Sequence, residues 1–274
     1  MRARMQMGKA LSVAALTCGL ASAANAAVRE GAVQTFISGL GNDGNASANC
    51  PRTNPCRTLA GAYPVTQSGG DIIALDPADY GPLAITGPLS ILGVQGGAVA
   101  VASGTTGITI NARAGEKIII RDLVISGAGA PNTTGIQLKG GLLVLRNSTL
   151  KLLTTGLHVE NAHADVLNTD IIGNTTGIET NGVGVPYNTA IGLYLPTACS
   201  PSCPTLVRIN GGNYTDNTTV FLENNPTSSG GQPTQTFWST NYFATGYTTL
   251  ETSTGTGGSA GNPSSPADVT PFPN

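Results

Sequence analysis

The sequence predicts an all-β protein: a parallel β-helix, or solenoid, with a short N-terminal capping helix and an aromatic C-terminal cap. The first observation is a phrase that recurs as NTTGIQLK (132–139), LTTGLHVE (153–160) and NTTGIETN (174–181). The second is the spacing of its glycine, 28, 21 and 21 residues, at Gly107, Gly135, Gly156 and Gly177. A repeat near 21 residues that holds several short apolar strands and turns is typical of a solenoid.

A second element follows a similar period and supports the same architecture. It comprises Asp122, Asn147, Asn168 and, 42 residues or two periods later, Asn210. Helical repeats are excluded because segments such as GLLVLRNSTL are short and rich in strand-forming residues. A leucine-rich pattern is missing, and no six-residue period of a left-handed hexapeptide helix is found. A parallel β-helix with one coil per repeat remains.

Equivalent positions of successive coils should form columns, because paired strands stack ~4.8 Å apart. Glycine is expected where a bend needs positive φ or where two backbones approach closely. Asparagine is expected where a turn is left-handed and its amide bonds to neighbouring coils. Strand alternation predicts an inward set, namely Ile136, Leu138, Leu157, Val159, Ile178 and Thr180. The outward set is Gln137, Lys139, His158, Glu160, Glu179 and Asn181.

The N-terminus has the features of a cleavable signal peptide. Basic residues (Arg2, Arg4 and Lys9) precede the apolar run ALSVAALTCGLASA, and Ala24-Asn25-Ala26 fits a small-residue cleavage site. An uncleaved anchor is the alternative, but the run is short for a membrane span. We therefore expect a secreted or periplasmic protein with no membrane span after cleavage.

The predicted organisation has five parts. Residues 1–26 are the signal peptide, 27–70 the N-terminal cap region, and 71–225 the β-helix coils. An excursion at 182–205 interrupts the coils, and residues 226–252 form the C-terminal cap. Residues 253–274, rich in Gly, Ser and Pro, form a flexible tail.

Both ends of a solenoid must be closed to protect their strand edges. At the N-terminal end, 54–63 is expected to be a helix with Asn54 as N-cap and Pro55 as its first residue. At the C-terminal end, five aromatic residues are expected to form the plug: Phe237, Trp238, Tyr242, Phe243 and Tyr247.

Cysteine usage fits an oxidising compartment. Cys18 leaves with the signal peptide, and an even number remains, at Cys50, Cys56, Cys199 and Cys203. Local pairing, Cys50 with Cys56 and Cys199 with Cys203, is the simplest of three connectivities. A four-cysteine zinc site is the rival, but neither pair has two-residue ligand spacing.

Charge and composition exclude some partners. The formal net charge is −2, which does not suggest nucleic-acid binding, and only 10% of residues are charged against about 25% in a typical globular protein. Glycine is abundant, with 37 residues, as suits many tight turns. We expect no cofactor.

A family resemblance adds to this. The segments TFISGLGNDGN, NPCRTLAGAY, GGDIIALDPADYGPLAIT and LSILG, between Thr35 and about Leu150, resemble a group of exported bacterial proteins with a right-handed parallel β-helix of the pectate-lyase-like type. The later coils match by rhythm alone. The resemblance implies a right-handed solenoid, but this fold carries lyases, hydrolases, adhesins and tailspikes, so it implies little about function.

The two chemistries familiar on this fold lack their residues. A lyase of this kind needs an acidic cluster to hold calcium, and Asp165 and Asp170 are too few, so we expect no metal site. A polygalacturonase-like hydrolase is indicated only by Asn168-Thr169-Asp170, without the paired aspartates, Gly-His-Gly or Arg-x-Lys of that family.

The repeat period itself suggests the candidate site. Gln137, His158 and Glu179 should stack in one column, beside a second column of Lys139, Glu160 and Asn181. Glu160 and Glu179 would be diagonal neighbours, ~7–8 Å apart at the backbone, near the ~6.5–9.5 Å carboxyl separation of inverting glycosidases. Catalytic candidates are therefore Glu160, Glu179 and His158. The simpler interpretation is a solvated strand face of mixed polar residues.

Three functions remain open. The first is a non-catalytic exported β-helix that binds a polysaccharide or has a surface role, with Gln137, Lys139, Asn181, Tyr187 and Tyr194 as ligand contacts. The second is a polysaccharide lyase or glycosidase acting on an acidic polysaccharide. The third is a structural or adhesive module. The protein is expected to be a monomer or a homotrimer.

Overall fold

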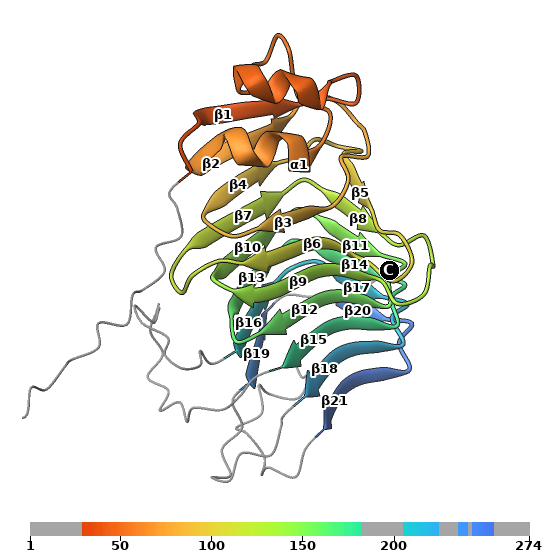
Figure 1. Cartoon of the computed structure of the whole chain (residues 1–274). Coiled ribbons are helices and arrows are strands. Elements are labelled where there is room, and N and C mark those ends of the chain that lie inside the picture. Colours follow the sequence, from red (N-terminus) through yellow and green to blue (C-terminus); the bar gives the residue numbers. More distant parts are fainter. Residues whose placement is uncertain (1–28, 182–204, 225–234, 241–242, 255–274) are drawn as a thin grey trace, which may run out of the picture.

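The computed structural model describes residues 29–181, 205–224, 235–240 and 243–254. Figure 1 shows a column of stacked strands with the helical segments gathered at one end. The chain visits three parallel sheets in turn, so that each coil contributes one strand to each sheet. The fold is therefore an all-β parallel solenoid, as the repeat predicts.

We call the three sheets A, B and C. Sheet A contains β1 (Ala32–Ile37), β2 (Thr66–Ala74), β4 (Leu89–Leu92), β7 (Lys117–Arg121), β10 (Leu142–Arg146), β13 (His163–Leu167), β16 (Thr205–Asn210) and β19 (Gln235–Thr240). Sheet B contains β5 (Ala98–Ala100), β8 (Val124–Ser126), β11 (Thr149–Lys151), β14 (Asp170–Ile172), β17 (Asn213–Thr215) and β20 (Phe243–Thr245). Sheet C contains β3 (Leu83–Ile85), β6 (Thr106–Asn111), β9 (Thr134–Gly140), β12 (Thr155–Glu160), β15 (Thr176–Asn181), β18 (Thr219–Asn224) and β21 (Thr249–Thr254).

The core is a set of apolar columns along the solenoid axis. In sheet C, one column consists of Leu83, Ile108, Ile136, Leu157, Ile178 and Phe221, paired in register from coil to coil. Five of the six are at most 5% exposed and Leu83 is 6% exposed. Because burying such a side chain is worth roughly 1.5–3 kcal/mol, each coil is stabilised chiefly by the coils on either side. The predicted inward set is confirmed.

The repeated glycine is required by close approach between coils. A Cβ added to Gly135 would lie 2.5 Å from the carbonyl oxygen of Gly156, and one on Gly156 would lie 2.6 Å from that of Gly177. None of these glycines has a positive φ. Of the two reasons expected for the repeat, close backbone approach is therefore the correct one.

Left-handed residues mark the corner where the chain leaves sheet A. Asp122, Asn147 and Asn168 have φ of 57°, 47° and 45°, as the repeated asparagine predicts. The prediction for Asn210 was wrong. Asn210 pairs with Leu167, and the next residue, Gly211 (φ 74°), takes the corner position.

The spacing after β15 was also predicted wrongly. Asp165 pairs with Arg208 one coil later, although 43 residues separate them. The residues from 168 to 210 therefore span one coil, whereas the prediction was two periods. The extra length falls in 182–204, which agrees with the prediction of an excursion there and lies outside the described residues.

The N-terminal helix is shorter than predicted. It is α1 (Leu59–Ala62), preceded by the 3-10 helix η1 (Asp43–Ala48) and followed by η2 (Tyr63–Val65). Its N-cap is Thr58, whose hydroxyl accepts from the amide of Gly61 at 2.9 Å, so the assignment of Asn54 and Pro55 was wrong. The reason is Cys56, which forms a parallel bridge with Ile37 and a disulfide with Cys50 and so holds the chain extended. The capping role stays a prediction.

The region expected to be the C-terminal cap contains β19, β20 and β21, which extend all three sheets. Phe237 and Trp238 lie in β19 opposite Val207 and Arg208, and Tyr247 is 39% exposed. Tyr242 lies outside the described residues. The aromatic plug stays a prediction.

Alanine at Gly156 tests the close approach between coils. Gly156→Ala is expected to destabilise the fold by about 2 kcal/mol or more, because the new methyl overlaps a backbone carbonyl that cannot move freely. Gly87→Ala is the control, since its Cβ would meet only Ser68 Oγ at 3.9 Å. Urea unfolding of both variants measures the effect, and equal midpoints would contradict the steric account.

Leu152 offers the opposite test, because it is a leucine at a left-handed corner. It has φ 54° and is 46% exposed, and the corresponding corner residues of later coils are Gly173, Asp216 and Gly246. Leu152→Asn should stabilise the protein by about 1 kcal/mol, since the left-handed conformation costs leucine roughly 1–2 kcal/mol. Leu40→Asn, at a 96% exposed leucine without positive φ, should change the urea midpoint little. Similar shifts in both variants would show that the corner strain is not the cause.

Asp76 should contribute to acid sensitivity. Its carboxylate accepts from Ser38 Oγ at 2.5 Å and from the Gly39 amide at 2.6 Å, and these bonds, the amide first, lower the pKa of Asp76. A depressed folded pKa stabilises the fold above the unfolded value of about 3.9, and this is lost as pH falls through the folded pKa. Thermal midpoints measured from pH 6 to 2 should fall less steeply for Asp76→Asn than for wild type. Asp71→Asn should keep the wild-type slope, and an Asp76→Asn curve parallel to wild type would refute the assignment.

Candidate functional site

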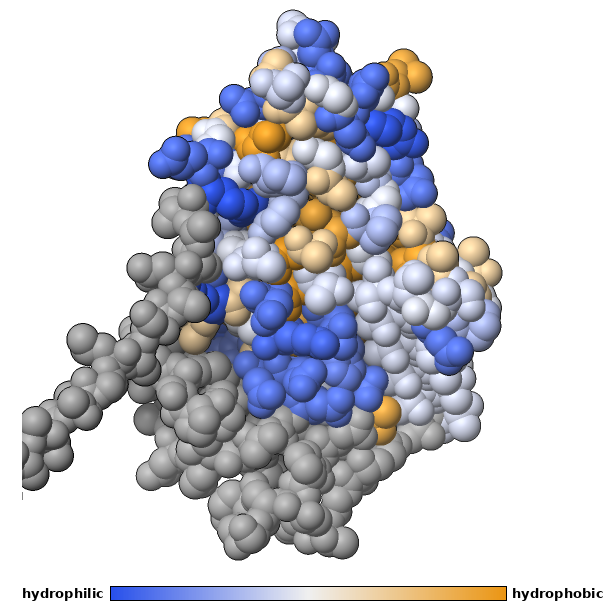
Figure 2. All heavy atoms as spheres, in the orientation of Figure 1, coloured by the Kyte–Doolittle hydropathy of each residue, from blue (hydrophilic) through white to orange (hydrophobic). Residues whose placement is uncertain are grey.

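The predicted polar columns lie on the outer face of sheet C. The register pairs His158 with Gln137 of the preceding coil and with Glu179 of the following coil. Glu160 pairs with Asn181. Figure 2 shows hydrophilic side chains gathered over β9, β12 and β15. The predicted column of Gln137, His158 and Glu179 is therefore confirmed as a structural feature.

His158 lies between two polar partners. Its Nδ1 is 3.2 Å from Glu179 Oε2, and its Nε2 is 3.2 Å from Asn181 Nδ2. The side chains of His158 and Glu179 are only 14% and 20% exposed. Because a carboxylate only accepts, Nδ1 must carry the proton, and a neutral Nε2 accepts from the amide of Asn181. Both ring nitrogens are thus engaged within the protein.

Glu160 and Glu179 are diagonal neighbours on β12 and β15, as predicted from the period. Adjacent strands place such positions ~7–8 Å apart. Their surroundings differ, because Glu179 also accepts from Thr155 Oγ1 at 3.4 Å in addition to its contact with His158. The catalytic role of either carboxylate stays a prediction.

Lys139 departs from the regular register. Ile110 pairs with Leu138, but the next residue, Asn111, pairs with Gly140, so Lys139 is the extra residue of a bulge in β9. Its side chain is exposed. The lysine therefore borders the polar columns instead of continuing the Glu160–Asn181 pair in register.

Some predicted residues lie outside the described ranges. Tyr187, Tyr194, Cys199 and Cys203 all belong to 182–204, so their roles stay predictions. The Cys50–Cys56 disulfide is confirmed, and both residues are fully buried beside β1. The pair joins the segment after η1 to the residues before α1.

The two aspartates considered for calcium do not converge. Asp165 binds Arg208 through two hydrogen bonds of 2.6 and 2.7 Å, and Asp170 accepts from the backbone and side chain of Asn213 at 2.9 Å. Within the described ranges, no group of three or more His, Cys, Asp or Glu residues is placed to hold a metal. In the same ranges no helix is long and apolar enough to cross a membrane.

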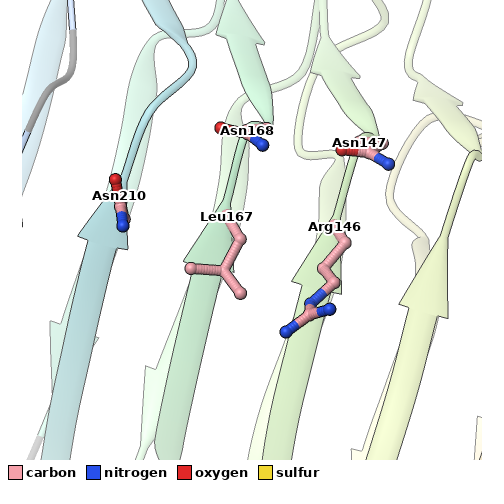
Figure 3. Close-up of a pocket in the computed structure, with 5 residues that line it drawn as sticks. All are labelled: Arg146, Asn147, Leu167, Asn168 and Asn210. Atoms are coloured by element: carbon pink, nitrogen blue, oxygen red, sulfur yellow. The ribbon is translucent and has the colours of Figure 1, made fainter.

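A pocket that sequence reasoning missed lies where the chain leaves sheet A. It has a volume of about 370 Å³ and is open on one side. Figure 3 shows the amides of Asn147, Asn168 and Asn210 following one another from coil to coil, with Arg146 and Leu167 on the strands beside them. The sequence signal was an arginine directly before the repeated corner residue, at Arg121-Asp122 and again at Arg146-Asn147.

Comparison with protein-family models, with curated proteins and with solved structures found no match to the chain. The resemblance to pectate-lyase-like proteins therefore extends, in the structure, to the parallel solenoid architecture.

Proposed function

We propose that this protein is exported and acts as a non-catalytic glycan-binding solenoid. The contact face is the outer surface of sheet C, formed by Gln137, Lys139, His158, Glu160, Glu179 and Asn181. One observation carries the proposal: this polar set repeats at the coil spacing on a sheet whose inward side is packed with large apolar side chains.

Rigidity favours binding by such a face. Each outward residue alternates with buried neighbours, as Glu179 does with Ile178 and Thr180, which are at most 1% exposed. The polar groups are thus held in place before a ligand arrives, which reduces the entropy lost on binding. Amide and carboxylate side chains offer both donors and acceptors, as sugar hydroxyl groups require.

The engagement of His158 argues against catalysis on this face. A general base must have a nitrogen or oxygen within reach of the substrate proton. Here the two nitrogens of His158 contact Glu179 and Asn181, and the Glu179 carboxylate also meets Thr155. A glycosidase remains the second candidate because of the diagonal placement of Glu160 and Glu179.

Export is supported by two independent features. The N-terminal 26 residues have the pattern of a signal peptide, and the Cys50–Cys56 pair is a disulfide, which persists in oxidising compartments. A periplasmic and an extracellular location are both compatible with these features.

A polysaccharide panel tests the proposal with the purified mature chain. We expect retardation in affinity electrophoresis on at least one acidic or neutral polysaccharide, without new reducing ends or unsaturated uronate absorbance. Glu179→Gln should weaken the retardation roughly tenfold, as loss of a charged hydrogen bond does. Lys117→Gln, an exposed change on sheet A, is the matched control.

Three results would redirect the interpretation. Turnover that Glu179→Gln abolishes would establish the enzyme hypothesis. Retardation that Glu179→Gln leaves unchanged would place the glycan elsewhere. Neither turnover nor retardation on any polysaccharide would favour a structural or adhesive module.

A further inference from the structure

We infer that the pocket at the end of sheet A binds the carboxylate-bearing ring of a sugar acid. This site is separate from the polar face of sheet C and does not depend on the function proposed for that face. It is formed by Arg146, Asn147, Leu167, Asn168 and Asn210, at the carboxyl ends of β10, β13 and β16.

The first argument is the charge of Arg146. Among the described residues, no ion pair or hydrogen bond engages its guanidinium group. The nearby charges are already matched: Arg208 binds Asp165 at 2.6 Å, and Arg121, one coil before Arg146, lies 3.7 Å from Asp122. One uncompensated positive charge therefore borders the pocket, and its planar fork is suited to a carboxylate.

The second argument is the set of three asparagine amides. All three side chains are exposed and, within the described ranges, make no hydrogen bond to the protein. Asn147 and Asn168 are held at left-handed corners, so their backbones are positioned by the fold. An amide offers two donors and an acceptor, which matches the alternating hydroxyl groups of a sugar ring.

Space and shape complete the argument. Gly211 follows Asn210 at the corner, and a Cβ there would lie 2.3 Å from Asn168 Oδ1, so glycine leaves room for the Asn168 amide. Leu167 provides an apolar surface between Arg146 and Asn210 in register. The volume of about 370 Å³ lies at the small end of ligand pockets, ~300–1,000 Å³, and suits a short ligand segment.

The test is a titration of the isotopically labelled full-length mature protein with D-glucuronate, followed by NMR of the asparagine side-chain amides. We expect saturable shifts of the Asn147, Asn168 and Asn210 signals, with D-glucose and acetate each binding at least tenfold more weakly. Arg146→Gln should weaken glucuronate binding at least tenfold. Arg121→Gln, which removes the equivalent arginine one coil earlier, should leave it unchanged.

Several outcomes would overturn the inference. Equal binding of glucose would remove the role of Arg146, and equal binding of acetate would reduce the site to an anion site without sugar recognition. No saturable shift, or an unchanged affinity in Arg146→Gln, would also refute it. Glu179→Gln is expected to leave glucuronate binding intact, so failure here is distinguishable from failure of the sheet C proposal.

Discussion

Parallel pairing of each strand with the strand one coil later determines where every described side chain of the solenoid lies. It stacks apolar residues into continuous columns inside and polar residues into columns outside. This pairing requires successive backbones to approach closely at one position per coil, and there the chain has glycine. The contact between the Gly135 position and the Gly156 carbonyl, repeated at Gly156 and Gly177, leaves no room for a side chain. The glycine column is therefore a condition for the pairing, and the outer polar face follows from it.

The corners impose a second requirement, which explains much of the remaining repeat. The chain turns out of sheet A through Asp122, Asn147, Asn168 and Gly211, all with positive φ. Short polar residues and glycine tolerate this conformation best. Buried corner amides also link the coils: Asn174 Nδ2 donates to Asn217 Oδ1 at 3.0 Å, and Asn217 Nδ2 donates to the carbonyl of Ile171 at 2.7 Å. The same residue type therefore serves backbone conformation at one corner and coil-to-coil hydrogen bonding at another.

Periodicity alone was sufficient to predict the fold class, the inward columns and the stacking of Gln137, His158 and Glu179. It failed where a local feature overrides the period. The position of Asn210 was misjudged because the 182–204 segment lengthens one coil, and Lys139 left its column because of a bulge in β9. The helix start was misplaced because the Cys50–Cys56 disulfide holds Cys56 extended. The Arg146 pocket was missed because its asparagines were explained as turn residues, and sequence does not show that their amides stay unengaged.

Functionally, the solenoid presents two separate polar surfaces that arise from different parts of each coil. The sheet C face is built from outward strand residues that contact one another, whereas the sheet A corner is built from residues whose polar groups remain available. Both depend on the coil-to-coil register, which is tested most directly by backbone NOEs in the deuterated, isotopically labelled protein. The account predicts contacts that align Asp165 of β13 with Arg208 of β16, 43 residues later. Contacts in another register, or none between these strands, would contradict it.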